Sequence, residues 1–177
     1  AFVKEGKVRF LTRTGIDWTD RYGVLAKAFE PLGCKEAIID GEIVVVDESG
    51  VTHFSDLQQA LSDKASERLT FFAFDLVHLD GYDLTKVPLL QRKETLRKLL
   101  APVTGPRSAL HFSDHVGGEG HVLYDQAVDL GLEGILSKRE NSTYVQERSK
   151  SWLKTKAVLS DDFPIVGYTE SAANGGL

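Results

Sequence analysis

Two lysines and a glutamate near the end of the sequence could together bind a phosphate group. Lys154 and Lys156 stand at alternate positions in the strand-like run 152–159, so both side chains point to the same face. Two ammonium groups held together repel each other, and a bound anion relieves that repulsion. Glu133 opens the strand-like run 133–136, and its carboxylate offers the oxygen ligands that hard cations prefer. The spacing predicts a nucleotide-phosphate site, and it fits an edge strand with solvated lysines equally well.

Two more acidic residues lie in the strongest predicted strand, 37–47, which reads AIIDGEIVVVD. Alternation places Asp40 and Glu42 on one face and Gly41 on the other. Charges in a β-branched run are unusual, because burying a charge without a partner costs free energy. A solvated strand end would explain them, but Gly41 permits close approach of a ligand or another backbone. We therefore favour a functional role for this strand.

The composition limits the class of protein. The 177 residues are 42% hydrophobic and 27% charged, which predicts a globular chain with a sizeable core. The sequence shows no membrane-length apolar run and no signal peptide, and its single cysteine, Cys34, fits a reducing compartment. The net charge of −5 argues against a simple basic nucleic-acid-binding domain. Residues 138–156 nevertheless carry six basic and two acidic side chains, which suits either a phosphate path or a solvated loop.

The order of the predicted elements indicates an α+β fold with antiparallel sheets and flanking helices, since turns join most strands. Helices are expected at about 17–32, 56–61, 88–101 and 118–130. Strands are expected as a hairpin at 2–12 and at 37–47, 69–79, 109–112, 133–136 and 152–159. In the strand 69–79, alternation predicts Phe72, Phe74, Leu76 and His78 on one face.

Five segments, in order along the chain, resemble the motifs of the covalent nucleotidyltransferases, above all the ATP-dependent DNA ligases. They are RTG at 13–15, DGEIVVVD at 40–47, FFAFDLVHLDG at 71–81, EGILSK at 133–138 and SWLKTK at 151–156. Within that family, the sequence is most similar to the ligase domain of the bacterial end-joining group called ligase D. The resemblance implies an ATP-grasp-like adenylation domain, in which antiparallel sheets form the nucleotide cleft.

The resemblance implies that ATP, bound as AMP, and Mg²⁺ are the cofactors. Phe74 would then stack on the adenine, because its ring offers a broad flat face. Glu42 would contact the ribose or support the metal, and Glu133 would help to hold the catalytic magnesium. Arg13 would lie near the nucleotide or near the 5′-phosphate of the DNA.

The same resemblance assigns the lysine pair to the reacting phosphate. Lys154 and Lys156 would neutralise the charge of the α-phosphate and act as catalytic residues. Asp40 and Asp75 are weaker candidates, which would orient their neighbours. Lys138 is weaker still, because strand alternation puts it on the face opposite the glutamate of its own motif.

One motif of the family, KxDGxR, does not occur in the 177 residues. Its lysine is the nucleophile that takes AMP from ATP, so we expect the chain by itself to be inactive. The sequence reads as an excerpt of a longer protein. Residues 1–159 would form most of an adenylation domain, and residues 160–177 would form a linker and the start of an oligonucleotide-binding (OB) fold.

The resemblance implies an ATP-dependent DNA ligase that seals nicks or broken ends through lysyl-AMP and DNA-adenylate intermediates, in double-strand break repair. DNA would be its partner, and it would act as a monomer in the bacterial cytoplasm. The end-binding protein Ku and fused polymerase and phosphoesterase domains follow only from the ligase D likeness. The alternatives are an RNA ligase, an mRNA capping enzyme, or a non-catalytic nucleic-acid-binding module.

Overall fold

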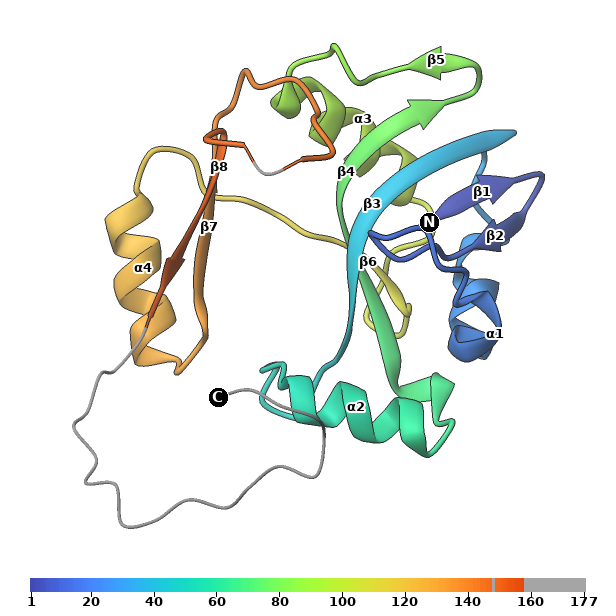
Figure 1. Ribbon diagram of the computed structural model, residues 1–177, viewed down its shortest axis with the longest axis horizontal. Coiled ribbons are helices and arrows are strands. Elements are labelled where there is room, and N and C mark those ends of the chain that lie inside the picture. Colours follow the sequence, from blue (N-terminus) through green and yellow to red (C-terminus); the bar gives the residue numbers. More distant parts are fainter. Residues whose placement is uncertain (148, 158–177) are drawn as a thin grey trace, which may run out of the picture.

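Two sheets of unequal size form the framework of the protein, as the computed structural model of residues 1–147 and 149–157 shows (Figure 1). The large sheet has the order β2-β1-β3-β4-β5, with β6 paired to β4. Its strands are β1 (Phe2–Lys4), β2 (Lys7–Arg9), β3 (Glu36–Val45), β4 (Leu69–Leu79), β5 (Tyr82–Asp83) and β6 (Leu110–Phe112). The small sheet pairs β7 (Gly134–Lys138) with β8 (Trp152–Lys156).

The α+β fold with antiparallel sheets is confirmed. All strand pairs in the large sheet are antiparallel except β4–β6, which is parallel, and β7–β8 is antiparallel as well. The proposed start of an OB fold at 160–177 lies outside the described residues. Within the described ranges, every helix is too short or too polar to cross a membrane.

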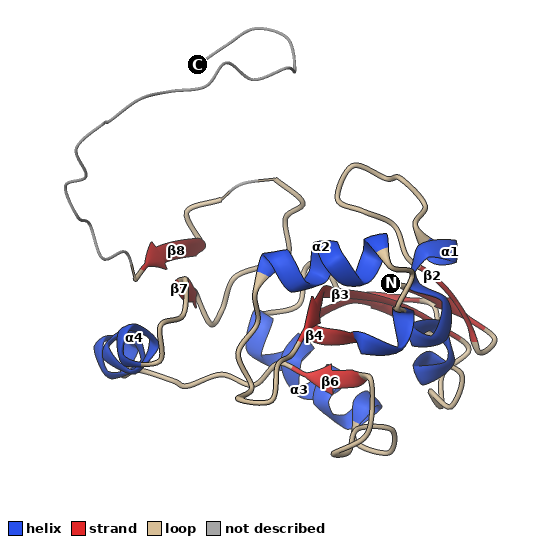
Figure 2. Ribbon diagram, turned by 90° about the horizontal axis from the view of Figure 1, so that it is seen from below, coloured by secondary structure: helices blue, strands red, loops and turns tan. Residues whose placement is uncertain are grey.

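Helices cover both faces of the central strands (Figure 2). Figure 2 shows α2 on one side of β3 and β4 and α3 on the other, while α4 lies beside the small sheet. The helices are α1 (Thr19–Tyr22), α2 (Phe54–Ser62), α3 (Leu89–Leu100) and α4 (Gly120–Asp129), with two 3₁₀ helices, η1 (Gly23–Phe29) and η2 (Ser66–Arg68). Residues from α2, α3 and η1 pack into one hydrophobic core with β3 and β4.

The single helix expected at about 17–32 is wrong in its form. The structure instead has a four-residue α-helix followed by a 3₁₀ helix, with a positive φ of 34° at Gly23 where the two meet. The side chain of Thr19 does not cap the helix, because its hydroxyl accepts a hydrogen bond from the Phe10 amide at 2.9 Å. The segment nevertheless packs on the core, where its residues Leu25 and Phe29 are buried.

Irregularities in the β3–β4 ladder re-aim side chains of β4. Pairing skips Phe74 between Ala73 and Asp75, and it skips Val77 between Leu76 and His78. Both skipped residues line a cleft, as expected where an extra residue bulges from a strand. Strict alternation along β4 is therefore wrong, because Leu76 lies in the core whereas Phe74 faces the cleft.

Gly41 is needed for packing, and it also lines a cleft. The edge of the Phe71 ring lies where a side chain at position 41 would begin, only 2.2 Å from the ideal Cβ position. That ring also packs edge-to-face on Phe29, with ring centroids 5.3 Å apart, and Phe29 packs in the same way on Phe10 at 5.3 Å. The bare backbone at this position thus admits the aromatic centre of the core.

We predict that Gly41→Ala destabilises the fold by about 1–3 kcal/mol, since the added methyl group overlaps the Phe71 ring and the Phe72 carbonyl oxygen. The free energy of unfolding, measured by chemical denaturation, reports the change. Gly33→Ala is the matched control, because a Cβ there meets open space. Equal stability of the two variants would contradict the packing argument.

Candidate functional site

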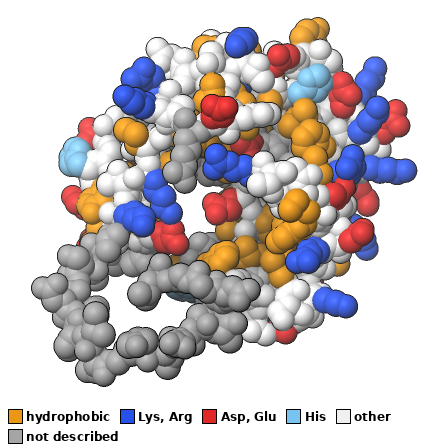
Figure 3. Space-filling model, viewed as in Figure 1, with side chains coloured by type: hydrophobic (Ala, Val, Ile, Leu, Met, Phe, Trp, Pro, Cys, Tyr) orange, Lys and Arg blue, Asp and Glu red, His pale blue; other side chains and the backbone are white. Residues whose placement is uncertain are grey.

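A cleft of about 1490 Å³ lies between the two sheets and receives side chains from both. This volume exceeds the few hundred to roughly 1000 Å³ of a pocket for one small ligand. Acidic and basic side chains lie interspersed around the middle of the face shown in Figure 3. The residues of the cleft that matter for the predicted site are Arg13, Asp40, Glu42, Phe74, Trp152 and Lys154.

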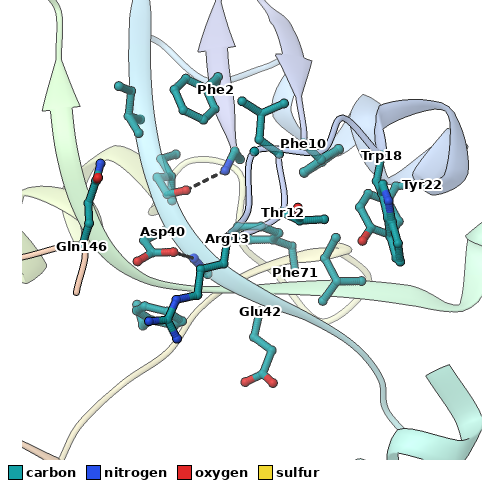
Figure 4. Close-up of a pocket in the computed structure, with 18 of the residues that line it drawn as sticks. Phe2, Phe10, Thr12, Arg13, Trp18, Tyr22, Asp40, Glu42, Phe71 and Gln146 are labelled. Atoms are coloured by element: carbon teal, nitrogen blue, oxygen red, sulfur yellow. Dashed lines mark hydrogen bonds between the residues drawn. The ribbon is translucent and has the colours of Figure 1, made fainter. Parts of the chain in front are cut away.

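On the large sheet, β3 directs its two acids into the cleft (Figure 4). The side chains of Asp40 and Glu42 extend from the strand, and Arg13 lies alongside them. Asp40 accepts a hydrogen bond from the Tyr144 hydroxyl at 2.9 Å. Burial raises the pKa of Tyr144 far above its ordinary value, and the negative charge of Asp40 raises it further. Tyr144 therefore remains a neutral donor to the Asp40 carboxylate.

On the small sheet, Lys154 and Glu133 form an ion pair. Lys154 Nζ donates to Glu133 Oε2 at 2.7 Å, and both side chains are largely exposed. The hydrogen bond from Lys154 lowers the pKa of Glu133, and the same bond raises the pKa of Lys154. The charge of Glu42 raises the pKa of Lys154 as well, so two carboxylates act on one ammonium group across the cleft.

The structure brings most of the predicted site residues together. Arg13, Glu42, Phe74 and Lys154 line one cleft, and Glu133 joins them through its ion pair with Lys154. Lys156 is exposed and does not line the cleft, although it occupies the same face of β8 as Lys154.

An unusual backbone conformation at Gly134 explains why Glu133 reaches Lys154. Gly134 has a φ of 139°, and an ideal Cβ there would lie 2.1 Å from the Thr155 carbonyl oxygen. Only glycine adopts this conformation readily. It directly follows Glu133, whose carboxylate accepts the hydrogen bond from Lys154.

Lys138 lies in the cleft region, between two aromatic rings. It pairs with Trp152 across the small sheet, and its Nζ is 3.7 Å from the Trp152 ring centroid. The same nitrogen is 4.1 Å from the centroid of Phe74, whose ring meets Trp152 edge-on at 5.8 Å. Both rings attract the ammonium group, while burial lowers the pKa of Lys138 to about 8.

Trp152 and Tyr144 were not predicted from the sequence as residues of this site. Trp152 stands two residues before Lys154, so strand alternation could have placed its ring on the cleft face. No comparable signal exists for Tyr144, because its partner Asp40 is 104 positions away in the sequence.

The carboxylates fit a magnesium ion that arrives with its substrate. Among the described residues, no group of three or more His, Cys, Asp or Glu side chains could hold a metal by itself. Mg²⁺ commonly binds through one or two carboxylates together with substrate phosphates. Glu133 and Glu42, which both act on Lys154, match that smaller requirement.

An aromatic ring on one wall and a lysine–carboxylate pair on the other define the class of site, which is a cleft suited to a nucleotide. Comparison with known sequences then establishes the family: the model of the ATP dependent DNA ligase domain matches residues 1–156. The chain belongs to the ATP-dependent DNA ligase family.

Individual relatives agree with this assignment. The multifunctional non-homologous end joining protein LigD of Pseudomonas aeruginosa is 40% identical over 168 residues, which are 95% of this chain and 20% of that protein. The corresponding DNA repair protein of Mycobacterium tuberculosis is 36% identical over 172 residues, which are 97% of this chain and 21% of that protein. The chain thus spans about a fifth of the length of these curated relatives.

A solved structure shows the same fold. Mycobacterial DNA ligase D, complexed with ATP and MES, superposes with a TM-score of 0.76 and 34% sequence identity. The match covers 88% of this chain and 49% of that one. The fold expected from the sequence is therefore that of a ligase domain of the ligase D type.

We predict that one lysine side chain titrates near pH 8. Burial lowers the pKa of Lys138 from 10.5 to about 8 because desolvation disfavours the ammonium form. Between these two values the unfolded chain binds more protons than the folded one, so the free energy of unfolding rises with pH. NMR titration of the lysine side-chain resonances measures the midpoint.

The titration has a direct assignment control. Lys138→Met should remove the signal that titrates near pH 8, while Lys156→Met, which alters an exposed residue of the neighbouring strand, should leave it in place. If every lysine titrates above about pH 10, the ordinary range, burial does not govern Lys138.

Proposed function

We propose that this chain forms the nucleotide-binding part of an ATP-dependent DNA ligase that joins breaks in duplex DNA. The observation that carries the proposal is the convergence of Phe74, Glu42 and the Lys154–Glu133 pair on one cleft. Membership in the ATP-dependent DNA ligase family supports the same reaction. The relatives named for non-homologous end joining suggest that the breaks are double-strand breaks awaiting repair.

In the proposed complex, ATP spans the cleft from one sheet to the other. The adenine stacks on Phe74, and Glu42 contacts the ribose or supports the metal. Lys138 now occupies one face of the Phe74 ring, so adenine either displaces this ammonium group or uses the opposite face. Such stacking would place the phosphates towards β8, which carries Lys154.

The phosphate end of the site would work by charge stabilisation. Lys154 exchanges its ion pair with Glu133 for contact with the α-phosphate, and Lys156 contributes its charge from the same face of the strand. Glu133 and Glu42 would hold a Mg²⁺ ion, whose charge would help to neutralise the phosphate oxygens. Fixed positive charges are effective here because negative charge accumulates on those oxygens in the transition state.

The proposed reaction has three covalent steps. The nitrogen of a nucleophilic lysine bonds to the α-phosphorus of ATP, and pyrophosphate leaves with the electrons of the broken P–O bond. A 5′-phosphate oxygen of the DNA then takes AMP from that lysine, which regains its free amine. Finally a 3′-hydroxyl loses its proton, attacks the activated 5′-phosphate and releases AMP. We assign Arg13 to the nucleotide or to the DNA 5′-phosphate.

Partners beyond DNA belong to the same proposal. Two of the relatives are described as multifunctional and are about five times as long as the stretch they share with this chain. Fused polymerase and phosphoesterase domains and an interaction with Ku are therefore part of the proposed context.

We predict that the 177-residue chain binds Mg²⁺–ATP weakly and forms no acid-stable AMP adduct. The sequence offers groups for adenine and phosphate but no lysine in the context KxDGxR. Transfer of label from α-labelled ATP to the protein tests this, with a longer polypeptide that contains such a lysine as the positive control. Robust labelling of the chain itself, with the adduct mapped to one of its own lysines, would refute the prediction.

We also predict that Phe74→Ala and Lys154→Met weaken ATP binding in different ways. Loss of the Phe74 ring should lower the affinity for adenosine and for ATP alike, by up to about tenfold, since aromatic stacking contributes about 0.5–1.5 kcal/mol. Loss of the Lys154 ammonium group should lower the affinity for ATP by about tenfold or more and leave the affinity for adenosine unchanged, because only ATP carries phosphates. Equilibrium binding of both ligands measures the difference.

Exposed residues supply the controls for these two variants. Tyr82→Ala removes an aromatic ring that is 74% exposed, and Lys98→Met removes a surface ammonium group of α3. Neither should change the affinity for either ligand. If Lys154→Met binds ATP as tightly as the parent chain, Lys154 does not contact the phosphates.

A further inference from the structure

Two neighbouring charged residues on the buried face of α3 have no role in the site described above. Arg92 is fully buried and Lys93 is 5% exposed, although the other buried residues of the helix are leucines. A buried charge contributes little to stability and is often replaceable by an apolar side chain of similar size. The contacts of these two residues indicate what they do instead.

Arg92 holds the chain segment that leaves β7. Its Nε and Nη2 donate to the two carboxylate oxygens of Asp75 at 2.7 and 2.8 Å, and Asp75 is also fully buried. Its Nη1 donates to the Ser142 carbonyl oxygen at 3.0 Å and also to the Val87 carbonyl oxygen. The planar guanidinium fork binds the carboxylate through two parallel hydrogen bonds and still reaches the carbonyls, whereas a lysine lacks this bidentate geometry. Arg92 therefore ties Ser142 to β4 through Asp75.

The same segment is attached to the N-terminus of α3 and to β3. The Leu89 amide donates to the Ser142 carbonyl at 3.0 Å, and the Leu90 amide donates to the Glu140 carbonyl at 3.1 Å. These bonds satisfy two of the amides that a helix leaves free at its N-terminus. Tyr144 stands over the Arg92 guanidinium at 5.9 Å and donates to Asp40 of β3.

Lys93 holds the segment that enters α4. Its Nζ donates to the Ser113 carbonyl oxygen at 2.7 Å and lies 4.7 Å from the centroid of the Phe112 ring. The Ser113 amide donates to the Ala73 carbonyl at 2.8 Å, next to Phe74 on β4. Helix α4 and strand β7 thus lie between two anchored points of the chain. Lys93 holds the segment before α4, and Arg92 holds the segment after β7, which leads on to β8.

No strand pairing joins β7 or β8 to the large sheet within the described ranges. The position of the small sheet relative to β4 therefore depends on side chains and on the two anchored segments. We propose that Arg92 and Lys93 are positioning residues that fix the small sheet, and with it Lys154 and Glu133, at the correct distance from Phe74 and Glu42. This inference rests on the proposed function, since it concerns the same nucleotide cleft.

The test compares two ligands that use different parts of the cleft. Adenosine requires the β4 side alone, whereas Mg²⁺–ATP requires the β4 side and the lysine of β8 together. In Arg92→Lys and Lys93→Met, we expect adenosine to bind as in the parent chain. We expect ATP to bind about tenfold more weakly, since misplacement by about 1 Å is costly at such sites. A purely structural role would lower both affinities together or neither.

Matched substitutions on the exposed face of α3 serve as controls. Arg97→Lys alters an arginine that is 58% exposed, and Lys98→Met alters a lysine that is 72% exposed. Both should leave the two affinities unchanged. A parent chain that binds ATP no more tightly than adenosine would count against the proposed phosphate site itself rather than against the anchoring.

Hydrogen exchange tests the anchoring without any ligand. In Lys93→Met and Arg92→Lys, the amides of β7 and β8 should exchange about tenfold faster by local opening, while those paired between β3 and β4 stay unchanged. The Tyr144 amide donates to the Thr85 carbonyl oxygen at 2.8 Å. In the parent chain, the anchored amides of Leu89, Leu90 and Tyr144 should exchange as slowly as the β3–β4 amides. Unchanged exchange of β7 and β8 in both variants, or rapid exchange of the three anchored amides in the parent, would overturn the proposal.

Discussion

The pairing of β3 with β4 sets the geometry on which the remainder of the protein depends. These two strands contribute seven of the seventeen buried residues of the hydrophobic core, and residues of both strands also line the cleft. A regular ladder would alternate strictly, but pairing skips Phe74, whose ring lines the same cleft as Asp40 and Glu42. The core and the nucleotide wall are therefore two consequences of one strand pairing.

Charge in the cleft is arranged around Lys154. Its ammonium group pairs with Glu133 and lies within the electrostatic influence of Glu42. The pair is exposed, so its contribution to stability is small and it can be exchanged for a better partner. A phosphate group that carries its own magnesium ion suits such a site, because it supplies an anion for the lysine and a cation for the carboxylates.

The buried charges of α3 contrast with that exposed pair. Arg92 and Asp75 are fully removed from solvent and bonded in a bidentate geometry, so neither can change partners without leaving a buried charge unpaired. A buried ion pair therefore holds the framework, while an exposed one lies at the cleft. This division matches the general need of a binding site for a fixed support behind adaptable contacts.

The sequence by itself determined the fold class, the strands that carry the site and the family. Strand β4 has the predicted bounds, and Lys154 and Lys156 lie in one strand, β8, because both follow from the repeat of the extended backbone. The motifs in order pointed to the DNA ligases, and the match over residues 1–156 confirms that membership. These features are local, so neighbouring residues specify them.

Only the tertiary structure decided which side chains meet. Lys138 lies between Phe74 and Trp152 because a bulge in one sheet faces a strand of the other, and the missing side chain of Gly41 makes room for Phe71. The partners of Arg92 are 17 and 50 positions away, at Asp75 and at Ser142. The repeat of a helix or strand relates only residues that are a few positions apart, so it cannot predict these partners. Strand register and the burial of charged groups are decided only when separate elements pack together.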